Sequence, residues 1–267
     1  MNTYFYYAKV YTFFFLCQLF FLIGYVLVNG IPYLNASLFS LTYTSENVSL
    51  LPSLINTLIM TLVSLAIAAP VGIFAAIFLV EYAKKGSRFV KLIRITAETL
   101  SGIPSIVYGL FGMLFFVTAL HWGMSLLSGA LTMVIMVLPL IMRTAEEALK
   151  SVPDSYREAS FGLGAGKLRT IFTIVLPSAV PGILAGVILA IGRVVGETAA
   201  LLYTSGTVAA VPNSLMGSGR TLALHMYVLS SEGLHVNQAS ATAVVILAFV
   251  LVINGLSGLV ARKIAKG

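Results

Sequence analysis

The feature that most restricts the fold of this chain is a series of apolar stretches, each about twenty residues long. Hydrophobic residues make up 59% of the 267 residues and charged residues only 9%, whereas soluble domains carry roughly 25% charged residues. Such a chain cannot cover a water-facing surface, and lipid must solvate much of it. Backbone groups in lipid need internal partners, and long runs without strict alternation favour helices over barrel strands.

The predicted fold is therefore an all-α membrane protein with six transmembrane helices. The expected spans are approximately 11–28, 54–80, 100–120, 124–142, 179–203 and 239–260. The first span lacks a small-residue cleavage site, so we expect it to be retained and not removed as a signal peptide. We expect residues 1–50 to supply this helix and an external segment, and residues 51–267 to form a core of five helices.

Basic residues predict the orientation of the spans. Of the sixteen Lys and Arg residues, thirteen lie in only three places, which are 81–96, 143–173 and the C-terminal end after 260. Loops rich in Lys and Arg face the cytoplasm, so both termini are predicted to be cytoplasmic. The net charge of +7 is then mainly a topology signal. Segment 204–238 is the longest connection on the other side. It is either a re-entrant or surface-lying connection, or a gate or docking lip for an external partner.

The loop 143–173 is much longer than a helix connection requires. Pro153 and Asp154 favour a helix start, so we expect one helix at about 153–161 and a second at about 167–175 that ends at Pro177. Glycines separate the two, and together they form a protruding knob, a name used below for residues 153–175. The knob is suited to docking in a soluble partner, although a hairpin at the membrane interface with no partner would have the same pattern.

Two kinds of residue on the knob point to docking. Arg157 and Glu158 supply charge, and the small residues Ala159, Ser160 and Gly164 keep one side slim. The pattern Glu158-Ala159-Ser160, Gly164 and then Ile174-x-Leu176-Pro177 resembles the EAA loop of ABC importer permeases, with Ser160 in place of the usual second alanine. That resemblance implies a type I importer permease (MetI-like) fold, and a loop that inserts into a groove of a cytoplasmic ATPase.

Further stretches narrow the resemblance, which extends over most of the chain from about residue 51. The segments 100–107, Gly192-Arg193-x-x-Gly196-Glu197-Thr198-Ala199 and 201–204 are similar to phosphate-importer permeases of the PstA type. The resemblance implies a multi-pass protein of the cell membrane that translocates phosphate. It also implies three partners, namely an ATPase dimer (PstB type), a second permease (PstC type) and an external phosphate-binding protein (PstS type).

Arg193 and Glu197 are expected deep in the fifth span, four residues apart on one helical face. Each charge at a bilayer centre costs about 2.5–3.5 kcal/mol, so the presence of two charged residues in this span requires an explanation. One interpretation is a self-neutralising pair that locks two helices. The other is a translocation path in which Arg193 meets an anion and Thr198 adds a hydroxyl donor. Glu197 then holds Arg193 in place when the path is empty.

Three smaller expectations concern packing and ion pairs. Arg143 and Glu147 have helical spacing and predict an ion pair. The glycines of the fifth span permit close helix approach, and they are Gly182, Gly186, Gly192 and Gly196. The Ser101–Pro104 stretch marks a kink, a hinge or a break that lines a cavity.

No other chemistry is indicated. Cys17 is interpreted as a buried hydrophobe, and the three histidines lack ligand spacing, so neither a metal site nor a catalytic residue is expected. No Gly-rich phosphate loop, cofactor or nucleic-acid site is expected either. The alternatives that remain are an ABC importer of another oxyanion such as sulfate or molybdate, a secondary transporter and a membrane enzyme.

Overall fold

The computed structural model describes residues 2–84, 86–233 and 235–266, and this part of the chain contains helices but no strand. Three five- to seven-residue π-helical turns interrupt or extend the helices, at Phe78–Tyr82, Met113–Ala119 and Ile171–Val175. The α-helices are α1 (Asn2–Gly30), α2 (Leu51–Ile77), α3 (Arg88–Ser101), α4 (Ser105–Gly112), α5 (Leu126–Lys150), α6 (Asp154–Gly162), α7 (Lys167–Thr170), α8 (Leu176–Val195), α9 (Ala199–Thr204), α10 (Leu222–Glu232) and α11 (Val236–Lys266).

Within the described residues, five helices are long and apolar enough to cross a membrane, and a bent pair supplies a sixth. The all-α membrane fold is thus confirmed. The break expected at Ser101–Pro104 is confirmed, because α3 and α4 meet there at a bend of 101°, and the third span expected at about 100–120 begins only after it, at Ser105–Ala119. Gly102 and Pro104 lie at this bend, and a proline disfavours a helical conformation in the residue before it.

The fifth span also differs from the prediction. One continuous helix runs from Lys167 to Val195, so the second helix of the knob does not end at Pro177. Proline normally breaks a helix by removing one hydrogen bond and by clashing with the carbonyl four residues earlier. Here the π-helical turn Ile171–Val175 immediately precedes it and changes the hydrogen-bond register, so the chain passes Pro177 without a break.

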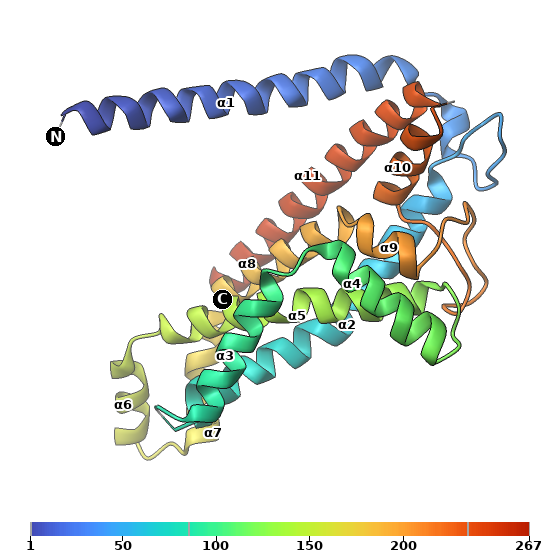
Figure 1. Ribbon diagram of the computed structural model, residues 1–267. Helices are drawn as coiled ribbons and strands as arrows, with labels where there is room; N and C mark the ends of the chain where they lie inside the picture. The colour runs from blue at the N-terminus through green and yellow to red at the C-terminus, as the bar shows by residue number, and fades with distance from the viewer. Residues whose placement is uncertain (1, 85, 234, 267) are drawn as a thin grey trace.

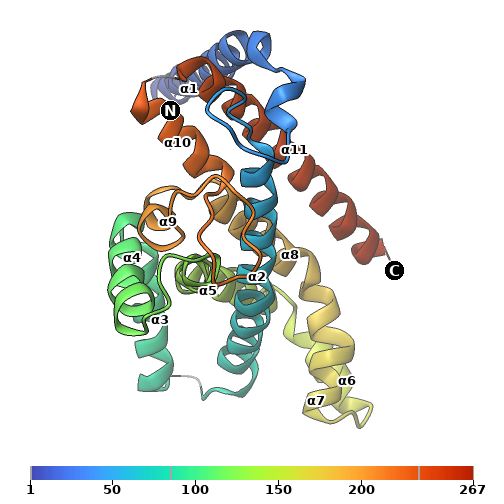
Figure 2. The same ribbon diagram turned by 90° about the vertical axis from the view of Figure 1, so that its right-hand side faces the viewer.

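The helices define two ends of the bundle, at the lower left and toward the right of Figure 1, and Figure 2 shows α6 and α7 far from α10. The knob end carries α6, α7 and the C-terminal end of α2. The far end carries the start of α2, the segment 205–221 and α10. Helix α2 and its π-helical extension run between these ends as one 32-residue helix, Leu51–Tyr82, which is about 48 Å long.

The core lies where α2, α5 and α8 pack together. Gly72 of α2 lies directly against Ile141 of α5, and Gly182 and Gly186 of α8 lie against α5 at Ala148 and Thr144. Close approach at Gly182 and Gly186 is therefore confirmed. Gly192 and Gly196 differ, because a side chain added at either would meet no other helix within 4 Å in the described part of the chain.

Helix α1 stands apart from the rest of the bundle (Figure 1). It contacts α11, and Gly30 at its C-terminal end permits this contact because any side chain there would collide with Ser240 and Val244. Large apolar side chains of α1 such as Phe14 and Phe21 are exposed. An apolar surface of this kind is solvated by lipid.

Candidate functional site

The knob begins and ends with local signals that the sequence predicts. Helix α6 starts directly after Pro153 and has Asp154 in its first turn, where a carboxylate favours the positive end of the helix dipole. It stops at Gly162, and Gly164 then adopts a left-handed conformation with a φ of 83°. The Ala165 amide donates to the Ser160 carbonyl at 3.1 Å, which closes the turn. The predicted helix at 153–161 and the glycine turn are thus confirmed.

The residues predicted to dock do not all lie on the surface. Glu158, Ala159 and Gly164 are exposed, and a depression of about 500 Å³ lies beside Ala159 and Gly164. Ser160 is only 4% exposed, and its hydroxyl lies 2.8 Å from the Thr170 hydroxyl. Ser160 is therefore not part of the exposed docking surface, because its side chain joins α6 to α7 from within the knob.

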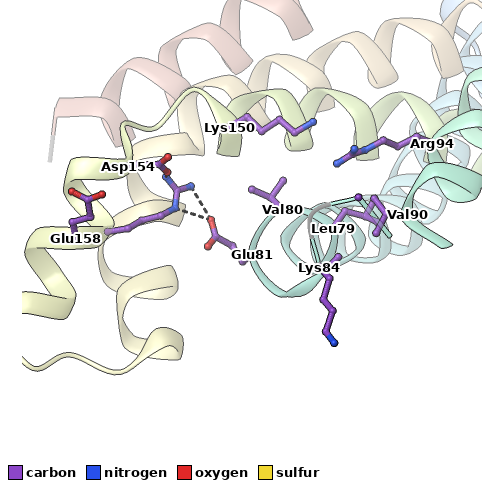
Figure 3. Close-up of a pocket in the computed structure, with 12 residues that line it drawn as sticks. Leu79, Val80, Glu81, Lys84, Val90, Arg94, Lys150, Asp154 and Glu158 are labelled. Atoms are coloured by element: carbon purple, nitrogen blue, oxygen red, sulfur yellow. Dashed lines mark hydrogen bonds and ion pairs between the residues drawn. The ribbon is translucent and has the colours of Figure 1, made fainter. Parts of the chain in front are cut away.

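Arg157 is also turned inward, contrary to its predicted place on the docking surface. Its side chain is 13% exposed and its Nε and Nη2 donate to Glu81 Oε1 at 3.1 and 2.8 Å (Figure 3). It also donates to the Leu149 and Val152 carbonyls and to Asp154 Oδ1, at 2.8–3.2 Å. Arg157 thus ties α6 to the π-helical extension of α2 and to the C-terminal end of α5 and the residues just after it.

A second tie joins the knob to the same turn of α2. The Lys167 ammonium lies 4.8 Å from the centre of the Tyr82 ring, within the range of a cation–π contact. The ties at Glu81 and Tyr82 both fall in the π-helical turn Phe78–Tyr82. A polar cavity of about 570 Å³ lies between α6, the Glu81–Arg157 contact and the start of α3. The knob is therefore attached to α2 as well as to α5 and α8, which it joins in the chain.

Helices α3 and α5 are joined by ion pairs near the knob. Glu146 is largely buried, and Arg94 Nη2 and Lys150 Nζ each lie 2.6 Å from its Oε1. Arg143 pairs with Glu98 at 4.0 Å. The predicted pair between Arg143 and Glu147 is wrong, because α3 brings Glu98 to Arg143 from another part of the chain.

The second candidate site surrounds Arg193, and its predicted geometry is also wrong. Helix α8 ends at Val195 with Gly196 as its C-cap, so Arg193 and Glu197 do not share a helical face. No ion pair joins them, and both residues are described. Glu197 is buried and accepts a hydrogen bond at 3.1 Å from the Ala200 amide, at the start of α9. Thr198 occupies the N-cap position of α9 without a side-chain cap bond.

Arg193 lies where two interrupted helices meet. It lies in the last turn of α8. In the neighbouring broken pair, the Tyr108 hydroxyl donates to the Leu100 carbonyl at 2.7 Å, across the break between α3 and α4. Gly109 of α4 packs directly on Ala200 of α9, beyond the break between α8 and α9. Broken helices at membrane depth are tolerated where they are buried in protein or line a cavity.

No metal site or free ion-binding cluster of His, Cys, Asp and Glu appears in the described part of the chain. Cys17, expected to be buried, is exposed on α1. Three residues that contribute to these sites were missed in the sequence, namely Glu81, Tyr82 and Arg94. The signal available for Glu81 was its position, as a single acid at the end of a long apolar run.

Comparison with known proteins identifies the family. A family model for the "binding-protein-dependent transport system inner membrane component" matches residues 68–266. The chain belongs to this family. It is accordingly a multi-pass membrane protein and a permease subunit of an ABC importer, and the fold and membrane location predicted from the sequence are confirmed.

Similar proteins in bacteria include permeases of several names. A probable ABC transporter permease, YqgI of Bacillus subtilis, is 33% identical over 266 residues, which cover 91% of this chain and 90% of the relative. Phosphate transport system permease protein PstA 1 of Mycobacterium tuberculosis is 42% identical over 154 residues, which cover 58% of this chain and 50% of the relative. A PstA homolog of Mycoplasma pneumoniae is 36% identical over 214 residues, which cover 77% of this chain and 33% of the relative. The chain thus spans half or less of the two PstA relatives.

Solved structures show the same fold. A bacterial alginate ABC transporter in complex with its periplasmic protein has a TM-score of 0.71 at 18% identity, covering 97% of this chain and 94% of that chain. The MetNI methionine ABC transporter has a TM-score of 0.61 at 18% identity, covering 80% and 93%. At this identity the likeness concerns the fold alone.

Proposed function

We propose that this chain is the membrane permease subunit of an ATP-driven importer that carries inorganic phosphate into the cytoplasm. The observation that carries the proposal is the identity of 35–42% with several relatives named as PstA phosphate permeases. The position of Arg193 supports it, because a guanidinium between two interrupted helices suits an oxyanion. In this proposal residues 51–267 form the permease core, and residues 1–50 add a helix and an external segment.

Arg193, Glu197 and Thr198 line the translocation path in this proposal. Arg193 has no carboxylate partner among the described residues, so its donors are available to a passing anion. Glu197 is occupied at the start of α9, and there it limits how long an anion stays near Arg193 by repulsion. Thr198 offers a hydroxyl at the same break in the helices.

The knob is the element that couples the path to ATP hydrolysis. Its exposed residues Glu158, Ala159 and Gly164 form the docking surface for a cytoplasmic ATPase dimer of the PstB type. Arg157 and Ser160 support that surface from inside the knob and carry its movement to α2 and α7. The knob end and both termini are then cytoplasmic, in agreement with the basic residues around them.

Two further partners complete the transporter. A second permease of the PstC type would enclose the path together with this chain. An external phosphate-binding protein of the PstS type would deliver phosphate to the far end. Segment 205–221 lies at that end and is the candidate contact for the binding protein.

Reconstitution tests this function directly. The chain is co-expressed with the candidate ATPase and partner permease and placed in liposomes with the external binding protein. We expect phosphate-loaded binding protein to stimulate ATP hydrolysis and phosphate uptake. Stimulation by sulfate-loaded or molybdate-loaded binding protein, and not by phosphate-loaded binding protein, would refute the assignment of phosphate as the substrate. ATP-independent uptake that follows an ion gradient would refute the transporter class.

The Arg193→Gln variant tests the path. We expect it to lose phosphate uptake while it still assembles with the ATPase, because Arg193 makes no ion pair that holds helices together. Arg88→Gln, which removes an exposed arginine, is the matched control and should retain uptake. Full uptake by Arg193→Gln would exclude the proposed role.

A further inference from the structure

A second buried arginine lies at the far end, outside both sites described above. Arg220 is the last but one residue of the segment 205–221, which precedes α10. Its backbone is held firmly, since its amide donates to the Val208 carbonyl at 2.9 Å and its carbonyl accepts from Asn56 Nδ2 at 3.2 Å. The Tyr43 ring covers the guanidinium, with its centre 4.8 Å away. The side chain is therefore fixed in place and enclosed.

The guanidinium of Arg220 has no partner for its charge. The residue is only 4% exposed, and its Nε and Nη2 have no hydrogen-bond partner. No carboxylate of the described residues lies within ion-pair distance of it. Nε and Nη2 form one edge of the guanidinium, the edge that binds two oxygens of a carboxylate or phosphate side by side.

Other buried polar atoms without a partner belong to residues that adjoin Arg220 in sequence or lie on the elements packed against its segment. Eight buried side-chain nitrogen or oxygen atoms lack a hydrogen-bond partner in the described part of the chain, and seven belong to residues of this region. We call these residues the Arg220 cluster, which consists of Ser53, Asn56, Arg220, Thr221 and His225. Native proteins leave few buried polar atoms unpaired, and each one requires an explanation. The concentration of seven in one place indicates a ligand.

The elements that form the cluster are in direct contact. The Leu222 amide donates to Thr57 Oγ1 at 2.8 Å, which holds the start of α10 against α2 one turn from Ser53. The Tyr43 ring packs edge-on against the His225 ring, with centres 6.2 Å apart, and also covers Arg220. The cluster therefore draws donors from α2, α10 and the segment between α9 and α10.

The cluster has donors but no negative charge. Arg220, Ser53, Thr221 and His225 each have an N–H or O–H to donate. Burial first, and then the charge of Arg220, lower the pKa of His225 to about 3, although the nearby Val48 carbonyl opposes the shift. His225 is thus neutral, and the cluster has a single positive charge. An unpaired buried cation costs more than a cation–π contact returns, so an anion would relieve this cost.

We propose that the Arg220 cluster is a binding site for a small inorganic oxyanion at the far end of the bundle. The anion accepts two hydrogen bonds from the Nε and Nη2 edge of Arg220 and further ones from the hydroxyls of Thr221 and Ser53. The site lies on elements other than those that hold Arg193. It is independent of which solute the chain transports.

Anion-dependent thermal stability tests the site. The full-length chain is purified in detergent in sodium gluconate, whose anion is too large for an enclosed cluster. Phosphate, sulfate or chloride then replaces gluconate at constant ionic strength. We expect phosphate or sulfate to raise Tm in a saturable manner, by roughly 5–10 °C at a hundred-fold excess over the half-saturating concentration. Stabilisation by chloride alone, or no saturable rise, would overturn the proposal.

Matched variants locate the effect. Arg220→Met keeps an unbranched side chain but removes the charge, and its Tm should not respond to either oxyanion. Arg88→Met removes an exposed arginine and should respond as the wild type does. Thr221→Val keeps the shape of the side chain and removes only its hydroxyl, so it tests the site even if Arg220→Met fails to fold. It should raise the half-saturating concentration of the oxyanion roughly ten-fold. A wild-type response in both Arg220→Met and Thr221→Val would assign the anion to another place.

Discussion

Arg157 and Arg220 are both largely buried, they lie at opposite ends of α2, and their surroundings are opposite. Arg157 donates to two carboxylates, Glu81 and Asp154, and to two backbone carbonyls. Arg220 has an aromatic ring above it and no acceptor for Nε or Nη2. A buried charge with every donor satisfied holds elements together, whereas one with free donors is suited to binding a ligand. The same residue type thus has two roles, and the difference lies in the neighbours.

The largest expected effect is the contrast in stability between two substitutions. Arg157→Met leaves the buried Glu81 carboxylate unpaired and should destabilise the protein by about 3–5 kcal/mol. Arg220→Met leaves no carboxylate unpaired, so in gluconate buffer its free energy of unfolding should fall much less. Unfolding of both variants in the same detergent measures the contrast. Equal losses would show that Arg220 is as much a structural tie as Arg157.

The Glu81→Gln variant sharpens the role of the knob end. The neutral amide keeps the shape but weakens the link between α6 and α2 by about 1–3 kcal/mol. In the reconstituted transporter we expect uptake per ATP hydrolysed to fall several-fold while ATP hydrolysis persists. Glu147→Gln, at an exposed acid, is the control. Partial recovery of uptake per ATP in the double variant Glu81→Arg with Arg157→Glu would assign the effect to this ion pair. Unchanged uptake per ATP in Glu81→Gln would contradict the proposed role of the pair.

Acid should weaken the far end through His225. The pKa is about 3 in the folded chain and 6.5 in the unfolded chain. Below pH 6.5 the unfolded state binds the extra proton, so this contribution to stability is complete above pH 6.5 and falls by about 1.4 kcal/mol per pH unit towards pH 3. Tm measured between pH 7 and 5 should fall less in His225→Gln than in the wild type. Parallel curves would show that another group titrates.

The smallest effect concerns two neighbouring glycines of the knob. Gly164 has a φ of 83° and Gly162 does not have a positive φ, and no neighbouring atom lies within 4 Å of a side chain added at either. Gly164→Ala should therefore cost about 1 kcal/mol through backbone strain alone. Gly162→Ala, in the last turn of α6, should cost nothing or stabilise slightly. A comparable loss in both variants would argue against the strain.

Local patterns predicted those parts of the molecule that depend on local physics. Apolar length fixed the number of spans, Pro153 and Asp154 placed the start of α6, and the glycines placed the turn at Gly164. The errors arose where two local signals competed. Pro177 was expected to end a helix, but a π-helical turn carries the chain past it, and Gly196 ends α8 before Glu197 can join the face of Arg193.

The remaining features depend on residues that are far apart in sequence. Glu81 and Arg157 are 76 positions apart, and nothing in either segment identifies the other. Arg220 is one of two charges in segment 204–238, and its burial under Tyr43 is a tertiary property. Periodicity and composition therefore locate helices, whereas the partners of a buried charge follow from how distant segments pack.

The ties on α2 have a consequence for insertions and deletions. Near one end Thr57 accepts the Leu222 amide, and at the other Glu81 accepts Arg157. One residue added between them would turn one contact relative to the other by about 100° and shift it by about 1.5 Å, so both could not form. The number of residues from 57 to 81 should thus vary little among related chains. A gap between these positions in an alignment would be expected only together with a change in the π-helical turn Phe78–Tyr82, where helical register is already altered.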